Sequence, residues 1–285
     1  MSKKIAIVTD SSASLPEEVL KEHNIYTSYL MIIFGNDSYQ EFKEITPQKF
    51  ADLSAAQTEL PSTSQPAIGV TVELYENLLK EGYDEIIHIT ISSGLSGSYQ
   101  SAVNAAEMVD AEKIHVFDSK TVAFPQGRLA VVAAKCVKEG KDVAEIIAEL
   151  EKLLAHTHVS ATVKTLDNLK KGGRLSNASA VIGSLLQVKP IIAMSPEGKL
   201  EAVSKVRTFK KAIGALIDIT KDANLDESYE VGIIHVLNPD DAEAFKAAIA
   251  EVYPNVTLHI VPLSLVVSAH VGEGTIAVSW AKTKY

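Results

Sequence analysis

Short apolar runs alternate with helical patterns along the first half of the chain. Runs at residues 5–8, 85–91 and 114–117 are rich in aliphatic and aromatic residues, which predicts strands buried on both faces. A further apolar run lies at residues 29–34. Strands that alternate with helices predict parallel βαβ units, and therefore a three-layer α/β/α domain. Two predicted helices begin near Pro16 and Pro47, because proline suits the first turn of a helix. Four further helices are predicted at residues 67–80, 98–109, 122–138 and 143–154.

The pattern changes after about residue 157. Residues 188–194 and 200–206 predict a hairpin around a Ser-Pro-Glu-Gly turn, which a parallel sheet would not contain. Further strands are predicted at residues 158–163, 231–236, 256–260 and 275–280, with helices at residues 208–220 and 240–252. We therefore predict an α/β fold with two domains. Residues 1–157 form an α/β/α parallel-sheet domain, and residues 158–285 form a two-layer α/β domain with a mixed sheet.

Composition narrows the classes of partner. The 285 residues carry a formal net charge of -9, which disfavours nucleic acid and limits membrane contact to a transient one. The single cysteine, Cys136, allows no disulfide within the chain and fits a reducing compartment. The first apolar run is too short for a signal peptide, and no run approaches the ~20 apolar residues of a membrane span. We expect a cytoplasmic protein.

Two hydroxyl-rich segments stand at positions where ligands bind in parallel-sheet proteins. Residues 10–14, Asp-Ser-Ser-Ala-Ser, follow the first predicted strand, and ligands bind beyond the carboxyl ends of such strands. Residues 62–66, Ser-Thr-Ser-Gln-Pro, precede a predicted helix, whose first amides favour anions. Helix capping explains either segment equally simply, so the sequence leaves both interpretations open.

Residues 92–98, Ser-Ser-Gly-Leu-Ser-Gly-Ser, give the strongest local signal. Their glycines allow a tight turn between a strand and a helix, with amides aimed outward. The segment is similar to a G-x-S-x-G nucleophile elbow, but Ser98 stands where the last glycine belongs. A serine esterase or thioesterase that uses Ser96, Asp118 and His270 remains an alternative hypothesis. A sensor of a small anion is another.

Two further segments carry charge or a titratable ring. Residues 170–176 form a basic turn in which Arg174 is either solvated or a bidentate donor to a carboxylate or phosphate. His270 precedes two glycines near the C-terminus. No phosphate-binding loop and no metal-ligand spacing occurs, so we expect no cofactor and no metal. Aliphatic residues near these motifs are core or cavity wall: Ile182, Leu185, Leu186, Val188, Ile191, Ile192, Leu265, Val266 and Val267.

Taken in order, these segments resemble the DegV family of fatty-acid-binding proteins over essentially the whole chain. Each motif is weak alone, but their order and spacing together are specific. The matching segments are Thr9-Asp10-Ser11, Thr63-Ser64-Gln65-Pro66, residues 92–97, Asp118-Ser119-Lys120, residues 172–176, Lys189-Pro190, Arg207-Thr208 and Ser268-Ala269-His270.

The resemblance implies a long-chain fatty acid held in an apolar tunnel between two domains. It also implies a lipid-binding subunit without autonomous catalysis, which presents the fatty acid to the ATP-binding subunit of a fatty-acid kinase for acyl-phosphate formation. The implied ligand-binding residues are Thr63, Ser64, Ser96, Gly97, Arg174, Arg207 and His270. Among them Arg174 is implied to assist the partner kinase.

Two positions depart from the family pattern. Gln40-Glu41 stands where an aspartate usually follows the tyrosine. Glu273 adds an acid close to the expected head group, and it weakens carboxylate binding if its side chain points inward. The motifs do not specify a chain length or a degree of unsaturation.

Overall fold

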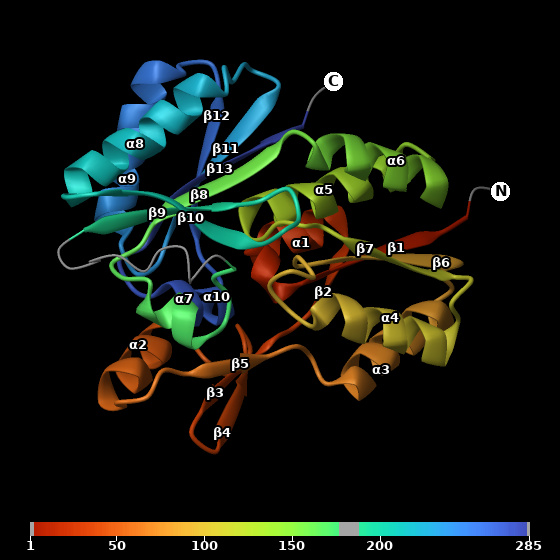
Figure 1. The fold of residues 1–285 in the computed structure, drawn as a ribbon. Coiled ribbons are helices and arrows are strands. Elements are labelled where there is room, and N and C mark those ends of the chain that lie inside the picture. The colour runs from red at the N-terminus through yellow and green to blue at the C-terminus, as the bar shows by residue number, and fades with distance from the viewer. Residues whose placement is uncertain (1–2, 177–187, 284–285) are drawn as a thin grey trace.

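The computed structural model describes residues 3–176 and 188–283 (Figure 1). Its first sheet is wholly parallel and has the strand order β2-β1-β6-β7. These strands are β1 (Ile5–Asp10), β2 (Ile25–Ser28), β6 (Glu85–Thr90) and β7 (Ile114–Asp118). Three of them were predicted. The edge strand β2 was missed because it is four residues long and only half buried.

Helices cover both faces of this sheet. Side chains of β1 alternate: Ala6 and Val8 pack towards α3 (Ile68–Lys80) and α4 (Ser98–Val109). Ile5 and Ile7 pack towards the opposite helical layer. That layer contains α1 (Glu17–His23), α5 (Phe124–Lys138) and α6 (Val143–Leu154). The predicted three-layer α/β/α arrangement is confirmed.

The second sheet has six strands in the order β10-β9-β8-β13-β11-β12. Only β11 and β12 pair in parallel, so the predicted mixed sheet is confirmed. Its strands are β8 (Thr157–Thr162), β9 (Lys189–Met194), β10 (Leu200–Val206), β11 (Tyr229–His235), β12 (Thr257–Pro262) and β13 (Ile276–Lys282).

Helices α8 (Phe209–Asp222) and α9 (Pro239–Val252) pack on one face of this sheet through Leu216 and Phe245. Helix α5 packs on the other face, where Phe124 lies so close to Gly232 that a Cβ there would come within 2.5 Å. Because α5 contacts both sheets, it lies between them (Figure 1). The domain boundary at residue 157 therefore stays a prediction.

A third, small sheet was not predicted. It is antiparallel, in the order β4-β3-β5, and contains β3 (Met31–Phe34), β4 (Asp37–Gln40) and β5 (Ser62–Ser64). The apolar run at residues 29–34 thus belongs to a hairpin and not to the parallel sheet. The signal was present in the sequence, because Gly35-Asn36 is a two-residue hairpin turn and Gly35 adopts a φ of 60°. Helix α2 (Pro47–Ala56) follows this hairpin.

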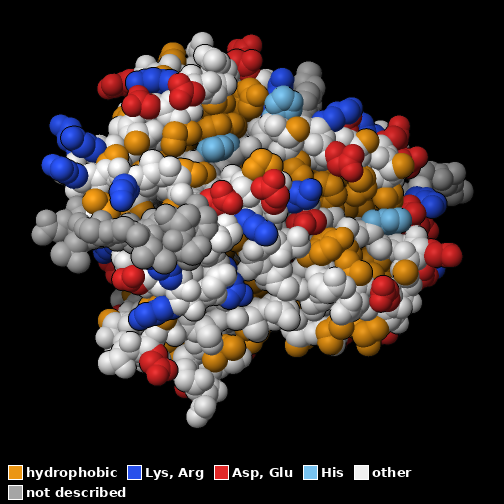
Figure 2. Space-filling view, viewed as in Figure 1, with side chains coloured by type: hydrophobic (Ala, Val, Ile, Leu, Met, Phe, Trp, Pro, Cys, Tyr) orange, Lys and Arg blue, Asp and Glu red, His pale blue; other side chains and the backbone are white. Residues whose placement is uncertain are grey.

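Two short helices, α7 (Asp167–Lys171) and α10 (Leu265–Val271), contact each other near the small sheet. Acidic and basic side chains are interspersed over the face drawn in Figure 2. Within the described residues, no helix has both the length and the apolar character needed to cross a membrane.

Candidate functional site

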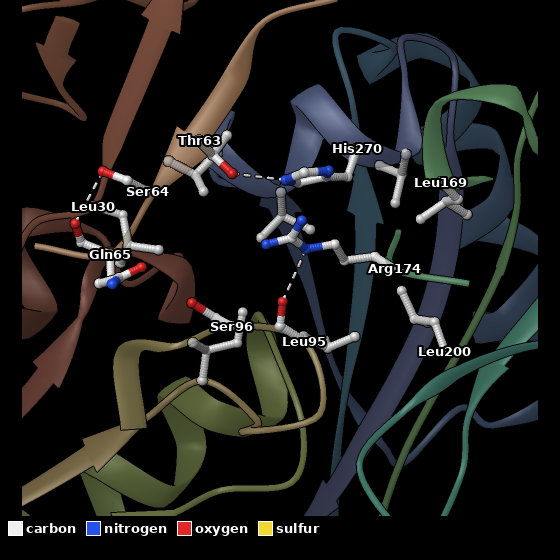
Figure 3. A pocket seen from close by; sticks show the side chains of 14 residues that line it. Leu30, Thr63, Ser64, Gln65, Leu95, Ser96, Leu169, Arg174, Leu200 and His270 are labelled. Atoms are coloured by element: carbon white, nitrogen blue, oxygen red, sulfur yellow. Dashed lines mark hydrogen bonds between the residues drawn. The ribbon is translucent and has the colours of Figure 1, made fainter. Parts of the chain in front are cut away.

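A cavity lies beside the point where the chain connections of the parallel sheet diverge. β1 and β6 are neighbours in the sheet. The chain continues from β1 to β2 on one side of this pair and from β6 to β7 on the other side. Such switch points are where open α/β sheets bind ligands. The cavity has a volume of about 50 Å³. It is lined by Leu30, Thr63, Ser64, Gln65, Ile91, Leu95, Ser96, Leu169, Arg174, Leu200, Val266, Val267, His270 and Val271 (Figure 3).

Thr63 and His270 form a hydrogen-bonded pair at one end of the cavity. Thr63 comes from β5 and His270 from α10, and the distance from Thr63 Oγ1 to His270 Nε2 is 2.7 Å. Burial, with a smaller effect from the nearby Arg174 cation, lowers the pKa of His270 to about 4. The ring is therefore neutral at pH 7 and carries one N–H.

Arg174 brings a positive charge into the same space. Its Nε donates to the backbone oxygen of Leu95 at 3.1 Å, and its Nη1 donates to the backbone oxygen of Gly172. These contacts hold the guanidinium so that it points into the cavity between Thr63 and Ser96 (Figure 3). A fixed cation in a mostly apolar cavity favours an anionic ligand group.

Hydroxyl groups complete the polar end. Ser96 Oγ lies 2.9 Å from Ser98 Oγ and accepts from the backbone N–H of Ser98 at the start of α4. The hydroxyl of Ser64 donates to the backbone oxygen of Gln65 at 3.1 Å. Gln65 also lines the cavity. Its motif was recognised in the sequence, but Gln65 itself was not assigned a role.

Residue 172 must be glycine because His270 packs directly against its backbone. A Cβ on Gly172 would lie 2.6 Å from His270 Nδ1, which is far inside van der Waals contact. The backbone of Gly172 is in the right-handed helical region, so space rather than conformation selects glycine here. Gly172 of the basic turn therefore leaves the space that His270 occupies.

Three predicted residues do not line this cavity. Gly97 is the N-cap of α4 and lies against Gln65 behind the wall. Arg207 is exposed after β10, seven residues beyond the cavity residue Leu200, and an extended strand of that length spans ~20 Å. Glu273 is exposed and pairs with Lys164 at 3.5 Å, so the inward acid considered from the sequence does not occur.

The segment at residues 10–14 serves structure. Asp10 caps the short 3-10 helix Ser11–Ala13, whereas the predicted helix at Pro16 has no side-chain cap. It is 1% exposed, and its hydrogen bonds go to groups of the protein.

The three residues of the hydrolase alternative are not assembled. His270 Nε2 bonds Thr63, Ser96 bonds Ser98, and Asp118 accepts from Ser93 and Lys120. Among the described residues there is no hydrogen bond between Ser96 and His270, so the arrangement of nucleophile and base that acyl transfer requires is missing.

The aliphatic residues noted in the sequence divide among several places. Val266 and Val267 line the cavity. Ile191 and Leu265 belong to the cores under α8 and around the small sheet, and Ile192 packs in the core beside the cavity. Ile182, Leu185 and Leu186 lie outside the described residues. The described chain contains no group of three His, Cys, Asp or Glu side chains placed to hold a metal ion.

Known proteins with similar sequences match almost the whole chain. The family model described as "Uncharacterised protein, DegV family" matches residues 4–283. A DegV domain-containing protein of Halalkalibacterium halodurans is 38% identical over 278 residues, covering 97% of this chain and 98% of the relative. The protein DegV of Bacillus subtilis is 37% identical over 278 residues, covering 97% of this chain and 98% of the relative.

Solved structures give the same result. The crystal structure of DegV from Bacillus subtilis, described as a fatty acid binding protein, has a TM-score of 0.90 and 36% identity, covering 99% of this chain and 100% of that one. A fatty acid binding DegV family protein from Streptococcus agalactiae has a TM-score of 0.90 and 35% identity, covering 98% and 99%. The fold is that of an α/β protein with a parallel sheet, a mixed sheet and a mostly apolar cavity that contains Arg174. This chain belongs to the DegV family.

Proposed function

We propose that this chain is a cytoplasmic carrier that binds a long-chain fatty acid with its carboxylate at Thr63, Ser64, Ser96, Arg174 and His270. One observation carries the proposal: the Arg174 guanidinium lies between the hydroxyls of Thr63 and Ser96 in a cavity with a mostly apolar lining (Figure 3). The descriptions of the relatives from Bacillus subtilis and Streptococcus agalactiae as fatty acid binding proteins support it. Gly97 and Arg207 are left out of the proposed ligand set because they do not line the cavity.

The tautomer of neutral His270 decides how Thr63 can contact the head group. If Nε2–H donates to Thr63 Oγ1, the Thr63 hydroxyl is free to donate to a ligand oxygen. The carboxylate then receives a hydrogen bond from Thr63 and a charge-assisted one from Arg174. Hydrogen bonds to a charged group contribute about 1.5–3 kcal/mol each.

The acyl tail supplies most of the gross binding energy. Burying methylenes yields roughly 0.8 kcal/mol for each, offset by the ordering of a flexible chain. The cavity of about 50 Å³ has room for only a few water molecules. Sites that enclose drug-sized molecules usually measure about 300–1,000 Å³. Binding of a long tail therefore requires the apolar walls to part.

We further propose that the bound carboxylate is presented to the ATP-binding subunit of a fatty-acid kinase. A depression of about 440 Å³ adjoins the cavity, shares Thr63, Arg174 and His270 with it, and also contains Lys171. This depression gives an external reactant access to the carboxylate, and Lys171 and Arg174 suit the phosphoryl charge. In this proposal Arg174 assists the partner's reaction, and the chain alone forms no acyl phosphate with ATP.

A pair of titrations tests the binding proposal. Delipidated protein is titrated calorimetrically with palmitate and with hexadecanol, which has the same tail without the charge. We expect one palmitate per chain and at least tenfold weaker binding of the alcohol, because Thr63 and Arg174 discriminate for the anion. Equal affinities, or no binding of palmitate, overturn the proposal. Covalent labelling of Ser96 by a fluorophosphonate overturns it in favour of the esterase.

The kinase proposal has a separate test. We expect Arg174→Ala to bind palmitate about 10- to 100-fold more weakly, because one charge-assisted hydrogen bond is lost, and to give no acyl phosphate even at saturating palmitate when ATP and a fatty-acid kinase ATP-binding subunit are added. Normal acyl-phosphate formation by Arg174→Ala contradicts the role given to Arg174.

A further inference from the structure

Two buried carboxyl groups lie behind the cavity wall. Asp10 is 1% exposed and Glu41 is 0% exposed. Asp10 Oδ1 accepts from the backbone N–H of Ser12 at 3.1 Å and from Gln126 Nε2 at 2.9 Å. Glu41 Oε2 accepts from Ser11 Oγ at 2.6 Å. Burying a carboxyl group is unfavourable unless hydrogen bonds compensate for the lost hydration. The hydrogen bonds to Asp10 and Glu41 provide this compensation and tie the donor segments together.

The acceptors hold three walls of the cavity by their backbone. The N–H of Ile91 donates to Asp10 Oδ2 at 2.7 Å, and the N–H of Val266 donates to Glu41 Oε1 at 3.0 Å. The N–H of Leu30 donates to Ser11 Oγ at 3.0 Å, and Ser11 in turn bonds Glu41. Leu30, Ile91 and Val266 all line the cavity. They come from segments far apart in the sequence.

Glu41 has the most direct connection to the head-group site. Val266 lies in the first turn of α10, and His270 follows it four residues later on the same helical face. This helix has only seven residues, so a shift at its start moves His270 with it. Helix α10 also packs against β5, which carries Thr63.

From this geometry we infer that Glu41 is a positioning residue for ligand binding. By holding the first turn of α10 through Val266 and the residue before β3 through Ser11, it sets the distance between His270 and Thr63. Glu41 does not line the cavity. This inference rests on the proposed carboxylate site. Its consequence is selective, because misplacing His270 weakens the hold on the carboxylate more than it alters the apolar walls.

The test replaces Glu41 in two ways. Glu41→Met keeps the length and fills the space with an apolar chain, but it leaves the N–H of Val266 and the hydroxyl of Ser11 without their acceptor. Glu41→Gln keeps an acceptor for Val266, while its amide can donate to Ser11 Oγ, which has a second lone pair for the N–H of Leu30. Palmitate and hexadecanol are titrated into each variant below its unfolding temperature.

We expect Glu41→Met to bind palmitate about tenfold or more weakly, with hexadecanol changed less than about threefold. Glu41→Gln restores palmitate binding to within about threefold. Equal losses for acid and alcohol, unchanged palmitate binding in Glu41→Met, or failure of Glu41→Gln to rescue each overturn the inference. If wild-type protein binds no palmitate, the proposed function fails and not merely the role of Glu41.

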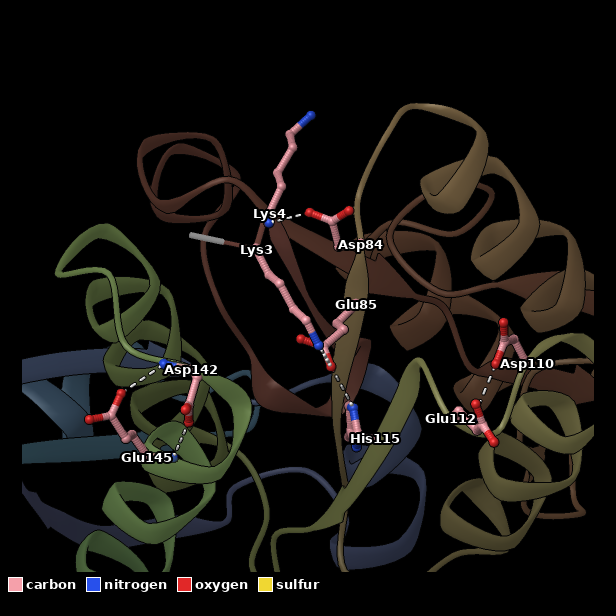
Figure 4. Close-up of polar contacts among 9 residues, drawn as sticks. All are labelled: Lys3, Lys4, Asp84, Glu85, Asp110, Glu112, His115, Asp142 and Glu145. Carbon is pink, nitrogen blue, oxygen red and sulfur yellow. Dashed lines mark hydrogen bonds and ion pairs between the residues drawn. The ribbon is translucent and has the colours of Figure 1, made fainter. Parts of the chain in front are cut away.

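Two more variants secure the result. Glu85 lies at the opposite end of β6, where Lys3 and His115 flank its partly buried carboxyl (Figure 4). Glu85→Gln should leave both affinities unchanged. Ser264→Ala removes the side-chain cap that accepts from the N–H of Val267 at 3.3 Å, together with a side-chain hydrogen bond to Glu41, and so disturbs the start of α10 while Glu41 itself is kept. It should weaken palmitate binding selectively, and equal losses for acid and alcohol contradict the positioning role of α10.

Discussion

The polar residues on the two sides of the cavity wall differ in where they direct their hydrogen-bonding atoms. On the inner side, Thr63, Ser96 and Arg174 present polar atoms to an apolar space. On the outer side, Asp10 and Glu41 direct their acceptors to N–H and hydroxyl groups of the protein.

Burial also shifts the pKa values of Glu41 and His270 in opposite directions. It raises the pKa of Glu41 to about 7 and lowers that of His270 to about 4, and the neutral form is favoured in each case. A hydroxyl-rich segment after a strand is thus a ligand site or a structural connector according to where its partners lie. The predictions below separate the two sides by stability and by ligand affinity.

The largest effect is expected from Asp10→Ala. The substitution leaves the N–H groups of Ile91 and Ser12 and the amide of Gln126 without their acceptor in the interior. We expect the free energy of unfolding to fall by about 3 kcal/mol or more, measured by urea denaturation. Asp218→Ala, an exposed aspartate paired with Lys221, serves as control and should change it by less than ~0.5 kcal/mol. A loss below ~1 kcal/mol for Asp10→Ala contradicts the structural role.

The two sides should respond oppositely to pH. The pKa of Glu41 rises from 4.5 to about 7 on folding, so its stabilising contribution is present below pH 4.5 and is lost as pH rises through 7. The pKa of His270 falls from 6.5 to about 4, so its contribution is present above pH 6.5 and is lost as pH falls through 4.

Unfolding free energies measured near pH 5 and near pH 7 test this contrast. Relative to wild type, Glu41→Gln should gain stability as pH rises over this interval and His270→Gln should lose it, each on the order of 2 kcal/mol. Curves that run parallel to wild type for both variants would show that neither group titrates as burial requires.

Thr63→Val should affect binding and spare stability. The isosteric change removes the hydroxyl that His270 contacts and that we expect to donate to the carboxylate. Palmitate binding should weaken by about 1.5–3 kcal/mol, measured by calorimetry, with the midpoint of thermal unfolding little changed. Ser62→Ala, in the exposed preceding position of β5, is the control. Unchanged affinity in Thr63→Val removes Thr63 from the site.

Gly172→Ala should have the smallest of these effects. The added methyl group would lie 2.6 Å from His270 Nδ1, and the ring must move away from Thr63 to accommodate it. We expect palmitate affinity to fall about tenfold, or roughly 1.4 kcal/mol. Gly214→Ala in α8, where a Cβ meets no atom within 4 Å, should leave affinity unchanged and raise stability slightly. Equal affinities in the two variants contradict the seating role of Gly172.

The long elements of the fold could be read from the sequence because their patterns are local. The bounds of α4, α6 and β10 agree with the predicted residues. The missed elements are short. β4 and β5 have four and three residues, and α10 has seven residues that are mostly buried, so it shows no amphipathic period.

The site was predictable only in part. The family motifs pointed to Thr63, Ser64, Ser96, Arg174 and His270, and all five line one cavity in the structure. Their roles towards a ligand remain predictions. The sequence could not show that Arg207 and Gly97 lie elsewhere, because strand length and helix capping decide their positions. The sequence showed Glu41 only as a departure from the family pattern. Its connection to Val266 joins residues more than 200 positions apart, which no local pattern reveals.

Native mass spectrometry of the purified protein, followed by extraction and identification of the released molecule, tests the central claim most directly. The account predicts one long-chain fatty acid bound per chain, lost from the Thr63→Val and Glu41→Met variants more readily than from wild type. A protein that retains no fatty acid after incubation with palmitate, or that carries an anion without an acyl tail, would contradict the carrier function while leaving the fold unchanged.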